Sequence, residues 1–126
     1  MQTELSPGIK GKIEILVTPD NTARAFSSGT VDVFATPAMI ALMEMTAQTS
    51  VSNYLPEGYI TVGTEVKVKH IKATPINKMV WAFTELVEIE NKKLIFNVEA
   101  HDENGKIGFG THVRYMVEEK AFLENL

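Results

Sequence analysis

The sequence predicts an α+β fold in which one long central helix is wrapped by a curved antiparallel β-sheet. Two observations support this prediction. A mostly apolar stretch from Val33 to Leu55 is rich in residues that favour helices, and the segments that follow it have the alternating pattern of β-strands. Because one face of the sheet and most of the helix surface need burial together, we expect the sheet to curl around the helix.

The composition is that of an ordinary globular protein. The chain has 126 residues, 44% of them hydrophobic and 22% charged, which predicts a single domain over residues 1–126. With a net charge of −4 and no runs of like charge, neither nucleic acid nor a membrane is expected as a partner. Without cysteine no thiolate metal site can form, and we expect no metal and no cofactor. No signal-peptide pattern or membrane-spanning run is present, so we expect a cytoplasmic protein.

The central helix contains an unexpected acid. Thr36 is suited to be its N-cap and Pro37 its first helical residue, and Pro56 would end it. Glu44 is the only charged residue in the stretch 33–55. A buried, unpaired carboxylate is costly, so its place among apolar residues indicates a site residue with a perturbed pKa. The alternative is that Glu44 reaches solvent or pairs across a subunit interface.

The rest of the chain is predicted to be strands. Alternation over residues 9–17 indicates a first strand, and Thr18-Pro19-Asp20 a short helical turn. Four further strands are expected at 59–72, 78–90, 93–102 and 106–118. The turns Glu90-Asn91-Lys92 and Asn104-Gly105 predict antiparallel hairpins. One such sheet leaves an edge and part of the helix uncovered, so we expect a homodimer.

His70 is a second candidate for the site. By the two-residue period of a strand, it shares one face with Val62, Thr64, Val66 and Val68. A lone histidine on an apolar face is more often a satisfied core residue than a catalyst. However, Glu44 is expected inside the same small core, and two buried titratable groups favour a shared site.

The start of the central helix is a third candidate. Its unpaired backbone N–H groups and the positive end of its dipole can bind an oxyanion or polarise a carbonyl. Thr36 lies there, although N-capping alone would explain a threonine before Pro37. Glu44 follows at a distance of about 12 Å along the helix axis. A site that contains both residues would therefore span a substrate or a subunit boundary.

Two other groups of residues are less specific. Four residues share one face of the last strand: Gly108, Gly110, His112 and Arg114. Glycines at this spacing fit no phosphate-binding loop and indicate a bulge or a close backbone approach. Four lysines gather near one end of the predicted sheet: Lys67, Lys69, Lys72 and Lys78. They indicate either a solvated face or a patch for phosphates.

Three motifs carry a resemblance that runs from Ile13 to Val117: VFATPAMIALME, TVGTEVKVKHIKATP and GFGTHVRYMV. The chain resembles the hotdog-fold thioesterases, in particular the group related to fluoroacetyl-CoA thioesterase. The resemblance implies a hotdog fold, a homodimer with active sites at its interface, and an acyl-CoA substrate. It also implies catalytic roles for Thr36, Glu44 and His70, and substrate binding by Gly63 and Arg114.

The chain departs from this group ahead of the helix. The fluoroacetyl-specific member closes its site with a phenylalanine-bearing lid, where this chain has Ser27-Ser28-Gly29-Thr30, with Phe26 and Phe34 as candidates to replace that phenylalanine. We therefore expect an acyl-CoA thioesterase for a small acyl group, without fluoroacetyl specificity. The alternatives are a hotdog protein that binds acyl-CoA or a related ligand without turnover, and a hydratase or dehydratase. The last is disfavoured because the histidine and acid pairing of hydratases is absent.

Overall fold

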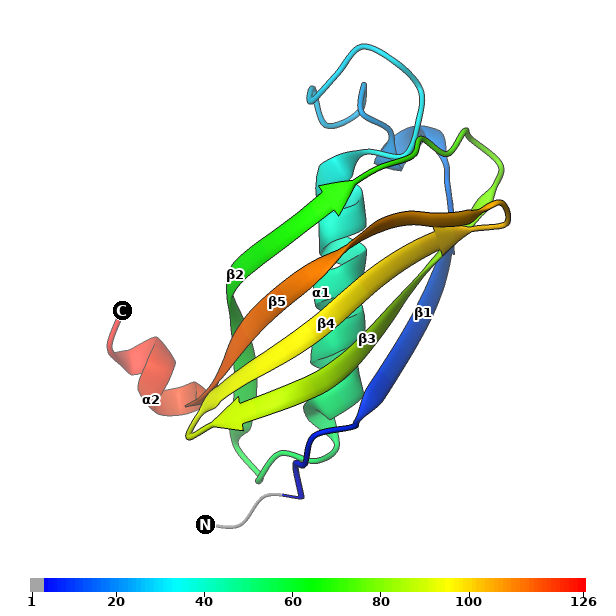
Figure 1. The fold of residues 1–126 in the computed structure, drawn as a ribbon. Helices are drawn as coiled ribbons and strands as arrows, with labels where there is room; N and C mark the ends of the chain where they lie inside the picture. Colours follow the sequence, from blue (N-terminus) through cyan, green and yellow to red (C-terminus); the bar gives the residue numbers. More distant parts are fainter. Residues whose placement is uncertain (1–3) are drawn as a thin grey trace.

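One long helix and a five-stranded antiparallel sheet make up most of the chain, of which this computed structural model describes residues 4–126. The elements are β1 (Lys10–Leu16), η1 (Pro19–Asn21), α1 (Thr36–Ser52), β2 (Tyr59–His70), β3 (Met79–Glu90), β4 (Lys93–Asp102), β5 (Gly105–Glu118) and α2 (Glu119–Glu124). Figure 1 shows α1 running behind the sheet, with the short helix α2 projecting beyond the end of β5. The predicted α+β architecture is confirmed.

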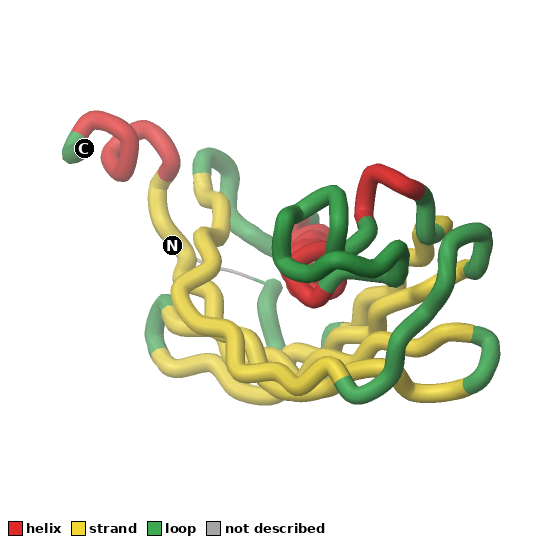
Figure 2. Tube along the Cα trace, turned by 90° about the horizontal axis from the view of Figure 1, so that it is seen from above, coloured by secondary structure: helices red, strands yellow, loops and turns green. Residues whose placement is uncertain are grey.

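The strands are joined as the predicted turns require. Their order across the sheet is β1-β3-β4-β5-β2, and each neighbouring pair is antiparallel. Asn91 lies in the first hairpin turn and Gly105 directly follows the second, with positive φ angles of 57° and 125°, a conformation that asparagine and glycine tolerate best. Viewed along the helix axis, the sheet curves around one side of α1 (Figure 2). β1 and β2 are left as the two edges.

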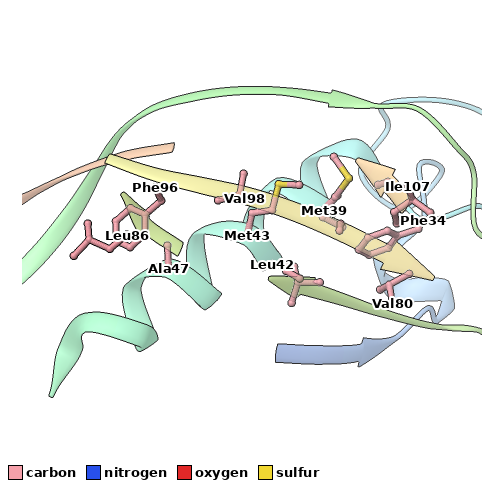
Figure 3. Close-up of a cluster of buried hydrophobic side chains, with 14 of the residues drawn as sticks. Phe34, Met39, Leu42, Met43, Ala47, Val80, Leu86, Phe96, Val98 and Ile107 are labelled. Carbon is pink, nitrogen blue, oxygen red and sulfur yellow. The ribbon is translucent and has the colours of Figure 1, made fainter. Parts of the chain in front are cut away.

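Only one side of α1 is buried against the sheet. Met39, Leu42, Met43 and Ala47 point from the helix into the core, where they meet side chains of the strands (Figure 3). The other side of the helix has exposed residues: Thr36, Ala41, Met45, Gln48 and Thr49. α1 therefore keeps a partly apolar stripe that residues 4–126 of one chain do not cover. No helix in this part of the chain is long and apolar enough to cross a membrane.

The start of α1 differs from the prediction. Ala35 is the N-cap, Thr36 is the first helical residue, and no side chain caps the helix. The predicted N-cap role of Thr36 is therefore wrong. The physical reason is a tertiary contact, because the Thr36 hydroxyl shares a hydrogen bond with His70.

A β-bulge in β2 changes the predicted faces of that strand. The pairing of β2 with β5 shifts by one residue after Gly63, which leaves Thr64 as the extra residue. The prediction that Val62 and Thr64 share the face of His70 is therefore wrong. Thr61 and Gly63 take that face instead, and both lie against the cluster of polar side chains on the helix side of the sheet.

Candidate active site

Two groups of polar side chains flank α1, and the first lies at the start of the helix. Thr36 Oγ1 and His70 Nδ1 are 2.8 Å apart and share a hydrogen bond. His70 is half-buried at the end of β2, and its Nε2 has no hydrogen-bond partner within residues 4–126. Burial lowers the pKa of His70 below its usual 6.5, against the opposing effect of the nearby Lys72 backbone. The imidazole is therefore neutral near pH 7 and able to accept a proton.

The Thr36 and His70 pair opens onto a pocket of about 360 Å³. Its other lining residues come from the two chain segments around it: Ala23, Ser28, Val33, Phe34, Ile71, Lys72 and Ala73. The buried Phe34 ring stands edge-on to the His70 ring, with 6.4 Å between centroids and an interplanar angle of 79°. Phe26 is 46% exposed and does not line the pocket. Of the two phenylalanines considered for a lid, only Phe34 lies at this pocket.

The start of α1 offers backbone hydrogen-bond donors beside Thr36. Because α1 has no side-chain cap, backbone N–H groups of its first turn lack a side-chain acceptor. Pro37 has no N–H, so the donors of this turn are those of Thr36 and Ala38. Such donors, together with the positive end of the helix dipole, can stabilise a developing oxyanion.

The second group is built around Glu44, in the middle of α1. Glu44 Oε2 lies 3.7 Å from Arg114 Nη1. The buried Arg114 guanidinium is fixed by Thr61, because Nε donates to its Oγ1 (2.8 Å) and Nη2 to its carbonyl (3.0 Å). The prediction that Glu44 lies buried in the core is wrong for the single chain, since its side chain is 39% exposed. Glu44 lies at the margin of the core, where it contacts the buried Arg114 and is also reached by solvent.

Gly63 lies directly against this carboxylate. A Cβ atom added to Gly63 would lie 2.5 Å from Glu44 Oε2 and 3.1 Å from Arg114 Nη1. Any other residue would therefore push the carboxylate away from the β2 backbone. This close approach explains why a glycine follows Val62 in a strand that is otherwise built from larger side chains.

His112 completes the second group and was not predicted as a site residue. It is 1% exposed, and its ring stacks on Phe96. Nδ1 lies 2.8 Å from the Glu65 carbonyl, which can only accept, so Nδ1 carries the proton. Nε2 then accepts a hydrogen bond from Arg114 Nη1 at 3.2 Å. The sequence feature that could have identified His112 is its position on the same strand face as Arg114.

The buried state of His112 predicts a pH dependence of stability. Burial lowers its pKa, and the positive charge of Arg114 acts in the same direction, against the Glu65 carbonyl and Glu44. Below the unfolded pKa of about 6.5, the unfolded chain then binds more protons than the folded one. We expect the folded state to be fully stabilised by neutral His112 above that pH and to lose this stabilisation as the pH falls. His70 contributes in the same direction.

Thermal melts from about pH 7.5 to about pH 5 test this expectation. His112→Gln should reduce the slope of melting temperature against pH, whatever its effect on stability at the upper pH. The matched control is Thr111→Val, on the outer face of β5, which removes no titratable group and should keep the wild-type slope. An unchanged slope for His112→Gln would contradict the prediction.

The two groups remain apart within one chain. Thr36 and Glu44 are about 12 Å apart along the axis of α1, and Gly63 and His70 are roughly 23 Å apart along β2. The expectation that Glu44 and His70 share one core within a chain is therefore wrong. The structure joins Thr36 with His70, and separately joins Glu44 with Gly63 and Arg114.

The lysines at one end of the sheet do not form an unpaired patch. Three of them have a carboxylate within salt-bridge distance: Lys67 with Glu65 (3.8 Å), Lys72 with Asp102 (3.9 Å) and Lys78 with Glu103 (2.9 Å). This arrangement favours the solvated face over the phosphate patch.

Comparison with solved structures defines the class of protein. A fluoroacetyl-CoA thioesterase superposes with a TM-score of 0.90 at 31% identity, over 96% of this chain and 94% of that one. A threonine-to-serine variant of that enzyme, in complex with acetyl-CoA, gives 0.90 at 30% identity over 96% of both chains. A thioesterase superfamily member from Thermus thermophilus gives 0.88 at 25% identity, over 95% of this chain and 89% of that one. The fold is the hotdog fold, as predicted, and these matched structures are thioesterases or members of the thioesterase superfamily.

Sequence comparison gives the family. The sequence profile of the fluoroacetyl-CoA-specific thioesterases matches residues 17–120. The fluoroacetyl-CoA thioesterase of Streptantibioticus cattleyicolor is 37% identical over 91 residues, which cover 72% of this chain and 66% of that protein, slightly under two thirds of its length. The chain belongs to the fluoroacetyl-CoA-specific thioesterase family, and the family predicted from the sequence motifs is confirmed.

Proposed function

We propose that this protein is an acyl-CoA thioesterase that hydrolyses a small acyl thioester. One observation carries the proposal, namely the hydrogen bond between Thr36 and His70 where the uncapped start of α1 meets a pocket. This arrangement combines a neutral base, an orienting hydroxyl and oxyanion donors, which are the groups that acyl transfer needs. The structures of a relative with acetyl-CoA, and with fluoroacetate and CoA, support this class of substrate.

Each residue then has a defined role. The thioester carbonyl lies at the start of α1, whose N–H groups stabilise the oxyanion, and Thr36 orients His70. Glu44 and His70 either activate a water molecule or form and resolve an acyl intermediate on Glu44. In both routes the C–S bond breaks, the proton passes to the CoA thiolate, and water supplies the oxygen of the free acid. Gly63 and Arg114 hold the substrate and the Glu44 carboxylate.

A homodimer would bring these residues together. Since the two groups are separate in one chain, we propose that Thr36 and His70 of one protomer face Glu44, Gly63 and Arg114 of its partner. The uncovered stripe of α1, which includes the exposed Met45, and the free edge strand β2 provide surface for this contact. Light scattering at micromolar concentration is expected to give the mass of a dimer, and a fully active monomer would contradict it.

Fluoroacetyl specificity is not part of the proposal. The loop ahead of α1 places Ser28, a small polar residue, at the pocket. The Phe34 ring is held beneath His70 in the core and is 1% exposed, so it is not free to act as a mobile lid. A volume of about 360 Å³ fits a short acyl group and the thioester.

The experiment is a hydrolysis screen over short, branched and aromatic acyl-CoAs, with release of the free thiol as the readout. We expect turnover of at least one short acyl-CoA. If none is cleaved, and one of them nevertheless binds with micromolar affinity, the alternative of a ligand-binding protein without turnover replaces the proposal.

Thr36 offers a test of the orienting hydroxyl. Because it does not cap α1, Thr36→Val should lower the stability by only about 1 kcal/mol, the usual size for one lost hydrogen bond. It should nevertheless lower kcat/KM by about 10-fold or more, since the bond to His70 is lost. Thr36→Ser should keep most of the rate. If the activity of both variants simply followed their melting temperatures, Thr36 would have only a structural role.

A further inference from the structure

The connection between β2 and β3 forms one wall of the pocket. Ile71, Lys72 and Ala73 line the pocket directly. The Ile71 N–H donates to the Ile107 carbonyl at 2.7 Å, which holds the start of this segment. The next residue after the wall, Thr74, is fully buried. The position of the wall therefore depends on what Thr74 contacts.

Thr74 is held by a buried acid on another strand. Asp102, the last residue of β4, is 4% exposed, and its Oδ2 accepts a hydrogen bond from Thr74 Oγ1 at 2.8 Å. Its Oδ1 accepts from the Asn104 N–H at 2.8 Å in the hairpin turn and lies 3.9 Å from Lys72 Nζ. The turn needs only Oδ1. Oδ2 is therefore free to hold the wall.

The same threonine connects the wall to His70. The Thr74 carbonyl accepts a hydrogen bond from the Phe34 N–H at 2.8 Å, and Val33 forms an isolated bridge with Pro75 beside it. The Phe34 ring in turn packs edge-on against His70. Contacts thus run without a gap from Asp102 through Thr74 and Phe34 to the imidazole.

We propose that Asp102 and Thr74 are positioning residues for the acyl pocket, which hold its wall and fix the Phe34 ring beside His70. The inference rests on the proposed function, because it takes this pocket as the place of the acyl group. Neither side chain lines the pocket, so the two act through the wall and not on the reacting atoms. Their loss should therefore change which acyl groups are accepted more than it changes the chemical step.

The physical reason is the cost of an unpaired buried carboxylate oxygen. Replacing Thr74 with valine keeps the shape of the side chain and removes the donor to Asp102 Oδ2. The Asp102 Oδ2 atom is then buried without a hydrogen-bond partner. This favours a movement of the wall that lets water reach the oxygen. A serine at position 74 keeps the donor and should keep the wall in place.

The experiment compares Thr74→Val, Thr74→Ser and wild type in two measurements. The first is kcat/KM over a series of acyl-CoAs of increasing length, where we expect Thr74→Val to change the ratio between short and long chains by about 10-fold. The second is amide hydrogen exchange at Phe34, which we expect to be about 10-fold faster in Thr74→Val. Thr74→Ser should match wild type in both. Thr111→Val, on the outer face of β5, is the matched control and should change neither.

Asp102→Asn provides a second variant if Thr74→Val folds poorly. The amide keeps an acceptor for the Asn104 N–H but loses the charge that strengthens the bond from Thr74. We expect Asp102→Asn to change the chain-length selectivity and the exchange at Phe34 in the same direction as Thr74→Val, but by less.

Wild-type selectivity and wild-type exchange at Phe34 in these variants would overturn the proposal. So would a loss of rate that is equal for every acyl chain and follows melting temperature, because the two residues would then only stabilise the fold. If wild type cleaves no acyl-CoA, the proposed function fails, whereas exchange at Phe34 still decides whether Thr74 holds the wall.

Discussion

His70→Ala is expected to lower thioester hydrolysis by about 10²-fold or more, the usual size for loss of an acid-base group, while the fold persists. The imidazole is half-buried and bonded to Thr36, and burial lowers its pKa. These properties suit a base that is neutral at physiological pH. The measurement is kcat/KM beside the melting temperature, so that a loss of folded protein is not mistaken for a loss of catalysis.

The pH profile gives a second readout of the same residue. With a pKa below 6.5, His70 should produce an acid limb of kcat/KM below that pH in wild type. His70→Ala should lose this limb together with the rate. His101→Ala is the matched control, since His101 bonds Glu99 on the outer face of the sheet and should keep both the rate and the limb. Full activity in His70→Ala would remove His70 from the catalytic set.

The fold could be predicted because its signals are local. The two-residue alternation of the strands, the Asn104-Gly105 turn and the apolar stretch ended by Pro56 each depend on neighbours in the sequence. The confirmed element boundaries differ from the predicted ones by a few residues. The errors arose where a distant contact decides the structure. The hydroxyl of Thr36 bonds His70 instead of capping the helix, although the two are far apart in the sequence.

The site could be predicted only in part, for the same reason. A glycine within a strand is a local sign of the bulge after Gly63, but it does not show that the bulge turns Gly63 toward Glu44. The exposure of Glu44 depends on which side of α1 the sheet covers, and an apolar sequence around it does not give that side. His112 was missed because its place in the second group depends on a hydrogen bond from Arg114, and the sequence shows only that the two share a strand face.

Glu44→Gln is expected to lower hydrolysis by about 10²-fold or more with the fold retained. Glutamine has nearly the same shape, and the Arg114 guanidinium is held by Thr61, so the position of Arg114 should be preserved. The substitution removes the negative charge that a base or nucleophile needs. Since the Glu44 side chain is 39% exposed, the melting temperature should change little. Wild-type rates in Glu44→Gln would leave the acid a role in binding only.

Mixing the two inactive variants decides how the site is assembled. If His70 of one protomer acts with Glu44 of its partner, a dimer of one Glu44→Gln chain and one His70→Ala chain contains one intact site and one doubly altered site. Random exchange of subunits makes half of the dimers mixed, so activity should return to about a quarter of the wild-type value. Each variant mixed with itself should recover nothing. Light scattering and differential tags show whether mixed dimers have formed. If they have formed and no activity returns, Glu44 and His70 of the same chain act in one site. The separation of about 12 Å between Thr36 and Glu44 along α1 would then have to be spanned by the substrate.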